Sequence, residues 1–266
     1  MEIVLTIAGS DPSAGAGIQQ DLKTITAMGC YGATVITALT SQNTMGVQHV
    51  MAVPPEVVQS QLDSIFSDLN VGAVKIGQIP DAGVAQVIID CLRVQNRQRN
   101  KPLPIVCDPV MISTSGHRLM AADCVHLVAT ELFPMASLVT PNIPEAESLS
   151  SQHITTDADI HAVGRMLASR YGTHILLKGG HAHGDMMTDR LFSTDGTVTT
   201  LSSPRIATRN LHGTGCTLSS AIASQLVKGC DMADAVTAAK TYVDAAIRGG
   251  VDLGVGHGNG PLFYCQ

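Results

Sequence analysis

The sequence lacks tryptophan and contains few other aromatic residues. Phe, Tyr and Trp together make up 3% of the 266 residues, whereas hydrophobic residues as a whole make up 45%. A core of this composition is filled by aliphatic side chains, which is typical of helices packed on a parallel sheet. We therefore expect an α/β fold.

Long apolar runs, basic clusters and an N-terminal targeting segment are also missing. No apolar run approaches the ~18 residues that a membrane span requires, and no basic flank precedes the apolar N-terminus. The formal net charge of -6 argues against nucleic-acid binding. The seven cysteines are odd in number and widely spread, which favours reduced thiols. We expect a cytoplasmic protein without a membrane or nucleic-acid partner.

Short apolar segments alternate with helical periodicity along most of the chain. The β-branched segments are predicted to be strands, and the segments between them carry apolar residues at three-to-four spacing. Around Asp195-Gly196 the pattern becomes an alternation typical of a two-residue β-hairpin, from about Met187 to Leu201. Two long helices are predicted to begin near Cys216 and Ala233. The predicted strands are residues 3–8, 33–39, 73–76, 105–107, 137–140 and 174–177.

No linker rich in Pro, Gly or Ser and no internal repeat divides the sequence, so we expect a single domain over residues 1–266. The predicted domain has a mostly parallel central sheet flanked by helices on both faces, with a small antiparallel hairpin. Ligands of such a sheet bind beyond the carboxyl ends of the strands. A ligand-binding rim is expected there, because polar residues and glycines follow the predicted strands at Gly9-Ser10-Asp11, Gln42-Asn43, Gly77-Gln78, Asp108, Asn142 and Lys178-Gly179-Gly180.

The segment His212-Gly213-Thr214-Gly215-Cys216 directly precedes a predicted helix. Glycines on both sides of Thr214 allow a tight turn with converging N–H groups, and the helix adds the positive end of its dipole. We call this predicted anion-binding turn, residues 213–216, the cradle. The same field is expected to lower the pKa of the Cys216 thiol. An anion site beside a base suits phosphoryl transfer to an alcohol, and a glycine-rich loop with a buried structural cysteine is the alternative.

Asp108 and Glu145 are the candidate metal ligands. Asp108 ends a buried apolar segment, where carboxylates seldom serve the core. Glu145 follows Thr140-Pro141-Asn142-Ile143-Pro144 on the same expected rim. Oxygen ligands of this kind suit Mg²⁺. For Glu145, the alternative is an acid that stabilises the first turn of a helix.

Three further sites allow two interpretations each. Lys178 is expected either to contact a nucleotide phosphate or to extend into solvent. Asp21 is expected either to contact a ligand or to interact favourably with the dipole of its own helix. His181 and His183 have the spacing of a chelating pair, but no third ligand has convincing spacing, so we favour a surface loop.

The chain resembles the ribokinase-like small-molecule kinases, and among them the hydroxymethylpyrimidine and phosphomethylpyrimidine kinases of thiamine biosynthesis. The resemblance covers essentially the whole length. Two departures are Gln78, where similar kinases usually have methionine, and Ser41, where alanine is usual. The resemblance is carried by Leu5-Thr6-Ile7-Ala8-Gly9-Ser10-Asp11, Gly15-Ala16-Gly17-Ile18-Gln19, Ser41-Gln42-Asn43-Thr44, Lys75-Ile76-Gly77, Asp108-Pro109-Val110-Met111, Thr140-Pro141-Asn142-Ile143-Pro144-Glu145, Lys178-Gly179-Gly180-His181, the cradle, and Gly256-His257-Gly258-Asn259-Gly260-Pro261.

This resemblance implies ATP with Mg²⁺, two successive phosphorylations at one site, and a homodimer. It implies catalysis by Cys216, at the position where many relatives have an aspartate base, together with Gly213, Thr214 and Gly215. Asp108 and Glu145 are implied on the metal side. The implied substrate contacts are Gln42, Gly9, Asp21, Gln78 and Val110, and the implied ATP contacts are Asn142, Lys178, Gly179 and His212; His212 is expected to pack or hydrogen-bond beside the cradle.

The chemistry of Gln42 supports a pyrimidine substrate independently of the resemblance. Its side-chain amide presents one donor and one acceptor side by side, which matches an aminopyrimidine edge. Pyridoxal instead presents a phenolic oxygen. We therefore expect phosphorylation of 4-amino-5-hydroxymethyl-2-methylpyrimidine and then of its monophosphate. One alternative is a pyridoxal kinase of the same fold. The other is a non-catalytic binding protein, and the presence of the cradle with Asp108 and Glu145 argues against this second alternative.

Overall fold

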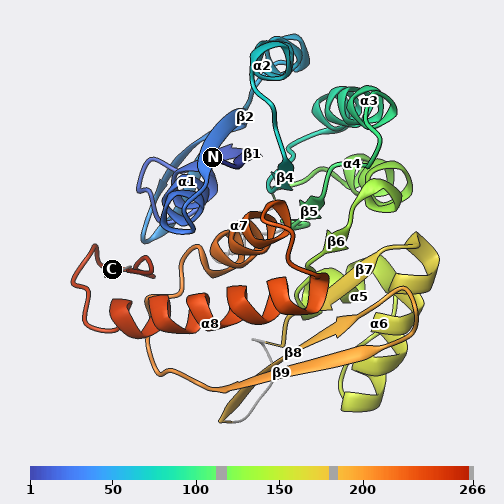
Figure 1. The fold of residues 1–266 in the computed structure, drawn as a ribbon. Coiled ribbons are helices and arrows are strands. Elements are labelled where there is room, and N and C mark those ends of the chain that lie inside the picture. The colour runs from blue at the N-terminus through green and yellow to red at the C-terminus, as the bar shows by residue number, and fades with distance from the viewer. Residues whose placement is uncertain (112–118, 180–184, 264–266) are drawn as a thin grey trace.

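The computed structural model describes residues 1–111, 119–179 and 185–263, and Figure 1 shows their fold. The strands form a nine-stranded sheet in the order β3-β2-β1-β4-β5-β6-β7-β8-β9. The pairs from β2 to β7 are parallel, whereas β3, β8 and β9 join the sheet in antiparallel pairs. The strands are β1 (Ile3–Ser10), β2 (Tyr31–Asn43), β3 (Gly46–Ala52), β4 (Ala73–Ile76), β5 (Ile105–Cys107), β6 (Leu138–Val139), β7 (His174–Leu177), β8 (Met186–Phe192) and β9 (Val198–Pro204).

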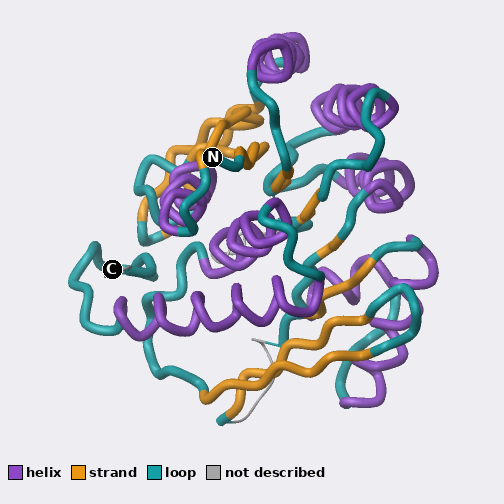
Figure 2. The backbone as a smooth tube through the Cα atoms, viewed as in Figure 1, coloured by secondary structure: helices purple, strands orange, loops and turns teal. Residues whose placement is uncertain are grey.

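Helices cover the two faces of the sheet in separate groups, as Figure 2 shows. Neighbouring residues of a strand point to opposite faces. Val4 packs with α1 (Gly17–Ala27), α7 (Thr214–Val227) and α8 (Met232–Gly250), whereas Leu5 belongs to the core on the other face. That second core is closed by α2 (Pro55–Asp68), α3 (Ala82–Arg97), α4 (Ala122–Leu127), η1 (Val128–Leu132), η2 (Phe133–Met135), α5 (Ile143–Ser150) and α6 (Asp157–Tyr171). The expected layered α/β architecture is confirmed.

Two details of the sheet differ from the sequence-based expectation. The edge strand β3 was not predicted, because most of its residues face solvent or are only half-buried and give no apolar signal. The hairpin of β8 and β9 is present, but its loop is longer than two residues. Ser193 N–H donates to the Thr197 carbonyl, so three residues lie between them, and Gly196 adopts a positive φ of 88° there. The alternation therefore located the hairpin but not its turn type.

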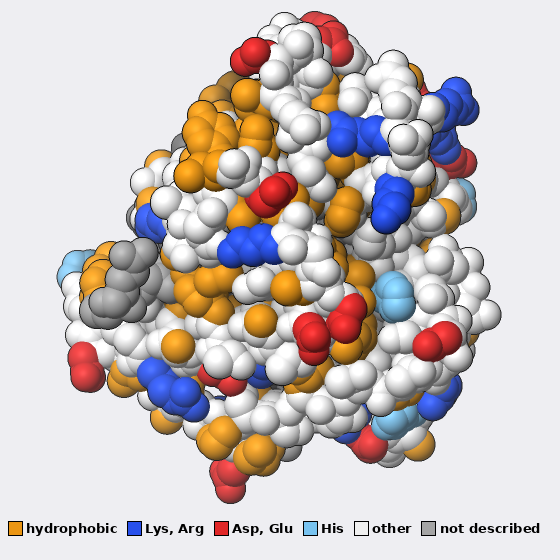
Figure 3. All heavy atoms as spheres, viewed as in Figure 1, with side chains coloured by type: hydrophobic (Ala, Val, Ile, Leu, Met, Phe, Trp, Pro, Cys, Tyr) orange, Lys and Arg blue, Asp and Glu red, His pale blue; other side chains and the backbone are white. Residues whose placement is uncertain are grey.

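Within the described residues, no helix combines the length and the apolar character needed to cross a membrane. Acidic and basic side chains are interspersed on the face of the molecule drawn in Figure 3.

Candidate active site

A cavity of about 370 Å³ lies at the carboxyl ends of the central strands. The expected rim therefore surrounds one cavity, as the rule for open parallel sheets predicts. Thirteen of the fifteen predicted site residues line it, and only Asp21 and Gly179 do not. The lining residues among the predictions are Gly9, Gln42, Gln78, Asp108, Val110, Asn142, Glu145, Lys178, His212, Gly213, Thr214, Gly215 and Cys216.

The cradle begins at Gly213, whose φ of 86° lies in the left-handed region. A Cβ atom at Gly213 would lie 1.9 Å from the Gly15 carbonyl oxygen, so only glycine fits. The N–H of Thr214 is already directed at the Leu211 carbonyl at 3.3 Å. Gly215 and Cys216 stand in the first turn of α7, where N–H groups have no acceptor within the helix. These two amides, rather than that of Thr214, are available to an anion.

The expectation of a lowered Cys216 pKa is wrong for the protein without ligands. Burial raises the pKa of the Cys216 thiol to about 11, and the charges of Asp21 and Asp108 act in the same direction. The ammonium of Lys75 and the N–H of Gly17 oppose this rise without cancelling it. Burial outweighs the helix field because α7 packs against α1 and the central strands, which leaves Cys216 only partly exposed to water.

Asp21 and Lys75 form a buried ion pair beside the cavity. Lys75 Nζ lies 2.8 Å from Asp21 Oδ2, and both side chains are completely buried. The hydroxyls of Thr6 and Ser220 donate to the two Asp21 oxygens at 2.6 and 2.9 Å. Both Asp21 oxygens thus accept hydrogen bonds from neighbouring side chains, and Asp21 is not among the residues that line the cavity; its contact with a substrate stays a prediction. Lys75, by contrast, lines the cavity, although the sequence reasoning gave it no role.

Asp108 is held by two neighbours at the end of β5. Lys178 Nζ lies 2.7 Å from Asp108 Oδ1, and Thr140 Oγ1 donates to the same oxygen at 3.0 Å. The other oxygen, Oδ2, is 3.0 Å from the position of a Cβ on Gly215, so it faces the cradle. Lys178 therefore does not extend into solvent, and its charge lies between a carboxylate and the anion site.

Glu145 has the first-turn role that the sequence allowed as the alternative, and it also lines the cavity where a metal is predicted. It forms a capping box with Asn142: Asn142 N–H donates to Glu145 Oε2 at 2.8 Å, and Glu145 N–H donates to Asn142 Oδ1 at 2.9 Å. It is also buried on the cavity wall, and burial together with the charge of Asp108 raises its pKa to about 7, although Lys178 acts against the rise. The negative charge of this wall is thus incompletely compensated.

Asp108 and Glu145 fit a Mg²⁺ ion that keeps most of its water. Two hard oxygen donors beside an anion site match that ion, and a divalent cation would compensate the charge that raises the pKa of Glu145. A set of protein ligands sufficient by itself is not present: no group of three or more His, Cys, Asp and Glu side chains in the described ranges is arranged to hold a metal. His181 and His183, the other pair considered, lie outside the described residues.

Gly179 has a structural reason to be glycine. A Cβ atom there would lie 1.7 Å from the Thr188 carbonyl oxygen, so β7 and β8 could not approach as they do. Its N–H donates to Asp189 Oδ1 at 2.8 Å, and Lys240 Nζ lies 3.2 Å from Asp189 Oδ2. This network fixes the chain directly after Lys178.

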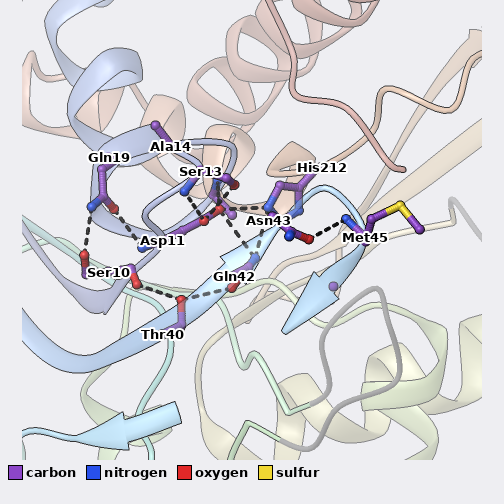
Figure 4. Close-up of polar contacts among 12 residues, drawn as sticks. Ser10, Asp11, Ser13, Ala14, Gln19, Thr40, Gln42, Asn43, Met45 and His212 are labelled. Carbon is purple, nitrogen blue, oxygen red and sulfur yellow. Dashed lines mark hydrogen bonds and ion pairs between the residues drawn. The ribbon is translucent and has the colours of Figure 1, made fainter. Parts of the chain in front are cut away.

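On the cavity wall, Gln42, Asp11 and His212 are in mutual contact (Figure 4). His212 Nε2 lies 2.8 Å from Asp11 Oδ2 and 3.1 Å from Gln42 Nε2. Burial alone would raise the pKa of Asp11, but hydrogen bonds from His212 and Ser13 hold it below its usual value. His212 thus stands beside the cradle as expected, and it contacts Gln42. Its contact with ATP stays a prediction.

Gln78 also lines the cavity. A Cβ atom at Gly9 would lie 2.2 Å from Gln78 Oε1, so glycine allows the amide to pack against β1. Gln78 Nε2 is buried and has no hydrogen-bond partner among the described residues. Val110 lines the cavity beyond Asp108.

The comparisons with known proteins point in one direction. The family model for phosphomethylpyrimidine kinase matches residues 11–262. The chain is 47% identical over 263 residues to a hydroxymethylpyrimidine/phosphomethylpyrimidine kinase of Rhizobium meliloti, covering 98% of this chain and 96% of the relative. A protein of the same name from Escherichia coli is 42% identical over 261 residues, with the same coverage of both chains.

Similar solved structures include both phosphomethylpyrimidine and pyridoxal kinases. A phosphomethylpyrimidine kinase from Clostridium difficile superposes with a TM-score of 0.80 at 38% identity, covering 93% of this chain and 100% of that one. A pyridoxal kinase from Staphylococcus aureus, in complex with AMP-PCP and pyridoxal, gives a TM-score of 0.86 at 30% identity, covering 98% and 93%.

Proposed function

The chain belongs to the phosphomethylpyrimidine kinase family, and on this premise we propose that it phosphorylates 4-amino-5-hydroxymethyl-2-methylpyrimidine with ATP, then phosphorylates the monophosphate, in thiamine biosynthesis. One observation carries the proposal: the Gln42 amide and the cradle with Cys216 open into the same cavity. A side chain suited to recognise the pyrimidine ring and an anion site for the transferred phosphoryl group thus line the same cavity. We further propose that residues 1–266 act as one catalytic domain, as a cytoplasmic homodimer.

In the first step, the substrate hydroxymethyl oxygen attacks the γ-phosphorus of ATP. Cys216, as the thiolate, accepts the hydroxyl proton while the new P–O bond forms and the bond to ADP breaks. The N–H groups of Gly215 and Cys216 donate to the transferring group. The buried ammonium of Lys75 favours the thiolate, which is the charge that this step requires.

On the ATP side, Lys178 and Asn142 are proposed to contact the nucleotide, with Gly179 setting the course of the chain behind Lys178. Lys178 already carries its charge into the cavity through its contact with Asp108. Asp108 and Glu145 would hold Mg²⁺, which supplies charge neutralisation on the phosphate oxygens.

In the second step, the acceptor is the phosphate of the monophosphate. Its oxygens are already largely ionised at neutral pH, since the second pKa of a phosphate ester is about 6. The same cavity then has to orient two anionic groups and compensate their charge, and proton removal by Cys216 is not required.

The test is ATP consumption with no acceptor, with the pyrimidine and with pyridoxal. The proposal expects turnover that depends on the pyrimidine and exceeds that with pyridoxal. Faster turnover of pyridoxal would assign the chain to the activity of its 30% identical structural neighbours. No acceptor-dependent turnover with either compound would leave a binding protein.

A further inference from the structure

The loop between β1 and α1, residues 11–16, is in close contact with the chain at the cradle. Asp11 Oδ2 lies 2.8 Å from Nε2 of His212, the residue that directly precedes the cradle (Figure 4). A Cβ atom at Gly15 would lie 2.3 Å from His212 Cδ2, and one at Gly213 would lie 1.9 Å from the Gly15 carbonyl oxygen. Glycine at both positions thus allows the backbone of the loop to touch that of the cradle.

Side chains of the loop and of α1 hold this β1–α1 loop in a single course. Asp11 accepts the N–H groups of Ser13 and Ala16, both at 2.9 Å. Lys23 Nζ donates to the Ala14 carbonyl at 2.7 Å. Ala14 has a φ of 59°, a left-handed conformation that persists in a non-glycine residue only where the surrounding structure enforces it. The position at which the loop enters α1 is therefore fixed.

Gly17, the first residue of α1, is directed at Cys216. Its N–H has no acceptor within its own helix, and it hydrogen-bonds the Cys216 sulfur, which works against the burial that raises the pKa of the thiol. Gly17 has a φ of 61°, and a Cβ atom there would lie 2.4 Å from the Gly9 carbonyl oxygen, so this N–H can be presented only by glycine.

Cys216 is also in the first turn of its own helix, α7. The N-terminal ends of α1 and α7 therefore both act on the sulfur, and both favour a negative charge there. The two helices pack against each other, and Gln20 Nε2 of α1 donates to Thr217 Oγ1 of α7 at 3.0 Å. The thiolate form of Cys216 thus depends on how the start of α1 is placed beside the start of α7.

We propose that Asp11 and His212 are a positioning pair that holds the start of α1 against the cradle, so that the Gly17 N–H stays on Cys216 while the sulfur accepts the substrate proton. One oxygen, Asp11 Oδ2, joins the two sides: it accepts the N–H of Ala16, which precedes Gly17, and it contacts His212 Nε2. This inference rests on the proposed function in one respect, that Cys216 is the base of the first step.

The positioning pair is expected to act on the first phosphorylation and not on the second. In the first, the hydroxyl proton passes to the Cys216 sulfur while the substrate oxygen forms its bond to phosphorus, so the rate depends on the thiolate. In the second, the acceptor oxygen is already ionised and needs no base. Both acceptors carry the same ring, so damage to the ring site lowers both rates, whereas loss of the positioning pair changes their ratio.

The test measures single-turnover rates with 4-amino-5-hydroxymethyl-2-methylpyrimidine and with its monophosphate, and compares the ratio of the two rates among variants. Asp11→Asn should lower the ratio of the alcohol rate to the phosphate rate about tenfold, the effect of one lost hydrogen bond to a charged group. Ser13→Ala is the matched control. It removes a hydroxyl that donates to the other oxygen of Asp11 at 2.8 Å, and it should keep the ratio.

His212→Gln and His212→Phe form a second matched pair. Glutamine keeps an N–H donor near the position of Nε2, whereas phenylalanine keeps a ring against Gly15 and has no donor. Only the phenylalanine variant should lower the ratio.

The same substitution in Cys216→Ser separates positioning from packing. Without the sulfur there is no thiolate for Gly17 to stabilise, so adding Asp11→Asn to Cys216→Ser should leave the ratio unchanged. The proposal is overturned by a ratio that Asp11→Asn does not change in the unmodified enzyme. It is equally overturned by a ratio that Asp11→Asn lowers to the same extent with and without the sulfur.

Hydrogen exchange of the Gly17 amide, followed by nitrogen-15 NMR, is a readout that needs no turnover. Relative to the amides of the central strand β1, exchange at Gly17 should be at least about tenfold faster in Asp11→Asn and unchanged in Ser13→Ala. Exchange as slow in Asp11→Asn as in the unmodified protein would overturn the proposal. If neither acceptor is phosphorylated, the proposed function fails, and this measurement still decides whether the positioning pair holds the Gly17 contact.

Discussion

Lys75 Nζ lies 2.8 Å from Asp21 Oδ2, and no part of either side chain reaches solvent. The pair stands near Cys216, whose pKa responds to both charges. Burying two charges costs desolvation free energy, which their mutual attraction offsets. Removing only one partner therefore destabilises the protein, because the other charge stays buried without compensation.

We expect Lys75→Met to lower the free energy of unfolding by about 3–5 kcal/mol, because the buried Asp21 carboxylate is left without compensation. Urea denaturation measures the change. The double variant Lys75→Met/Asp21→Asn should recover much of the loss, since no buried charge then remains. A double variant as unstable as the single one would show that packing of the lysine chain, and not its charge, stabilises this region.

Gln42→Ala should reduce kcat/KM for the pyrimidine by about tenfold to a hundredfold, the effect of a lost bidentate pair worth ~1–3 kcal/mol. The KM for ATP should stay nearly constant, because the hydrogen bonds of Gln42 go to Thr40, Asp11 and His212 and not to Lys178 or Asn142. Steady-state kinetics with each substrate varied in turn provide the measurement. Gln42→Glu should also reduce pyrimidine use, since the donor is replaced by a charge. Equal losses for both substrates would place Gln42 outside the ring pocket.

Asp108→Asn and Glu145→Gln should each raise the Mg²⁺ concentration needed for half-maximal activity. Both changes keep the size of the side chain and remove one negative charge, so they test charge at nearly constant shape. Titration of activity with Mg²⁺ makes the comparison. Curves that superimpose on that of the unmodified enzyme would leave these carboxylates a structural role only.

The Mg²⁺ requirement should also depend on pH through Glu145. Its pKa is raised to about 7, so the side chain gains a proton as the pH falls from 8 to 6, and a protonated carboxyl attracts the cation less. The half-maximal Mg²⁺ concentration is therefore expected to rise toward pH 6. In Glu145→Gln this pH dependence should be weaker, because the titrating group is gone.

The sequence was sufficient to predict the parts of the fold that are written in local patterns. Buried parallel strands such as β4 and β5 are apolar apart from Lys75 in β4, and their ends were found to the residue. The polar residue that follows each strand located the rim, because all parallel strands end at the same edge of the sheet. The solvent-facing β3 left no such pattern.

Side-chain pairing could not be predicted in the same way. Asp21 and Lys75 are 54 positions apart, and Asp11 and His212 are 201 apart, so no local spacing links them. The Cys216 pKa was misjudged for a related reason. The field of a helix terminus is a local property, whereas the burial that outweighs it depends on α1 and the central strands, which pack against α7.

The strongest test of the chemistry concerns Cys216, because the two proposed phosphorylations make different demands on it. The first acceptor must lose a hydroxyl proton, and a general base contributes about 10²–10⁴-fold to such a step. The second acceptor is a phosphate, which needs orientation and charge compensation instead. We therefore expect Cys216→Ser to slow transfer to the alcohol far more than transfer to the monophosphate, with single-turnover rates measured for each acceptor separately.

The pH dependence gives the same assignment an independent check. With a thiol pKa of about 11, the thiolate fraction grows as the pH rises from 6 to 9, so the rate of the alcohol step should rise steadily over this range. The rate of the phosphate step should rise less, because its acceptor is already ionised above a pKa of about 6. In Cys216→Ser the rise of the alcohol step should disappear. Equal losses for both acceptors, with parallel pH profiles, would instead mean that Cys216 supports the packing of α7 beneath the cradle, and that another group removes the proton.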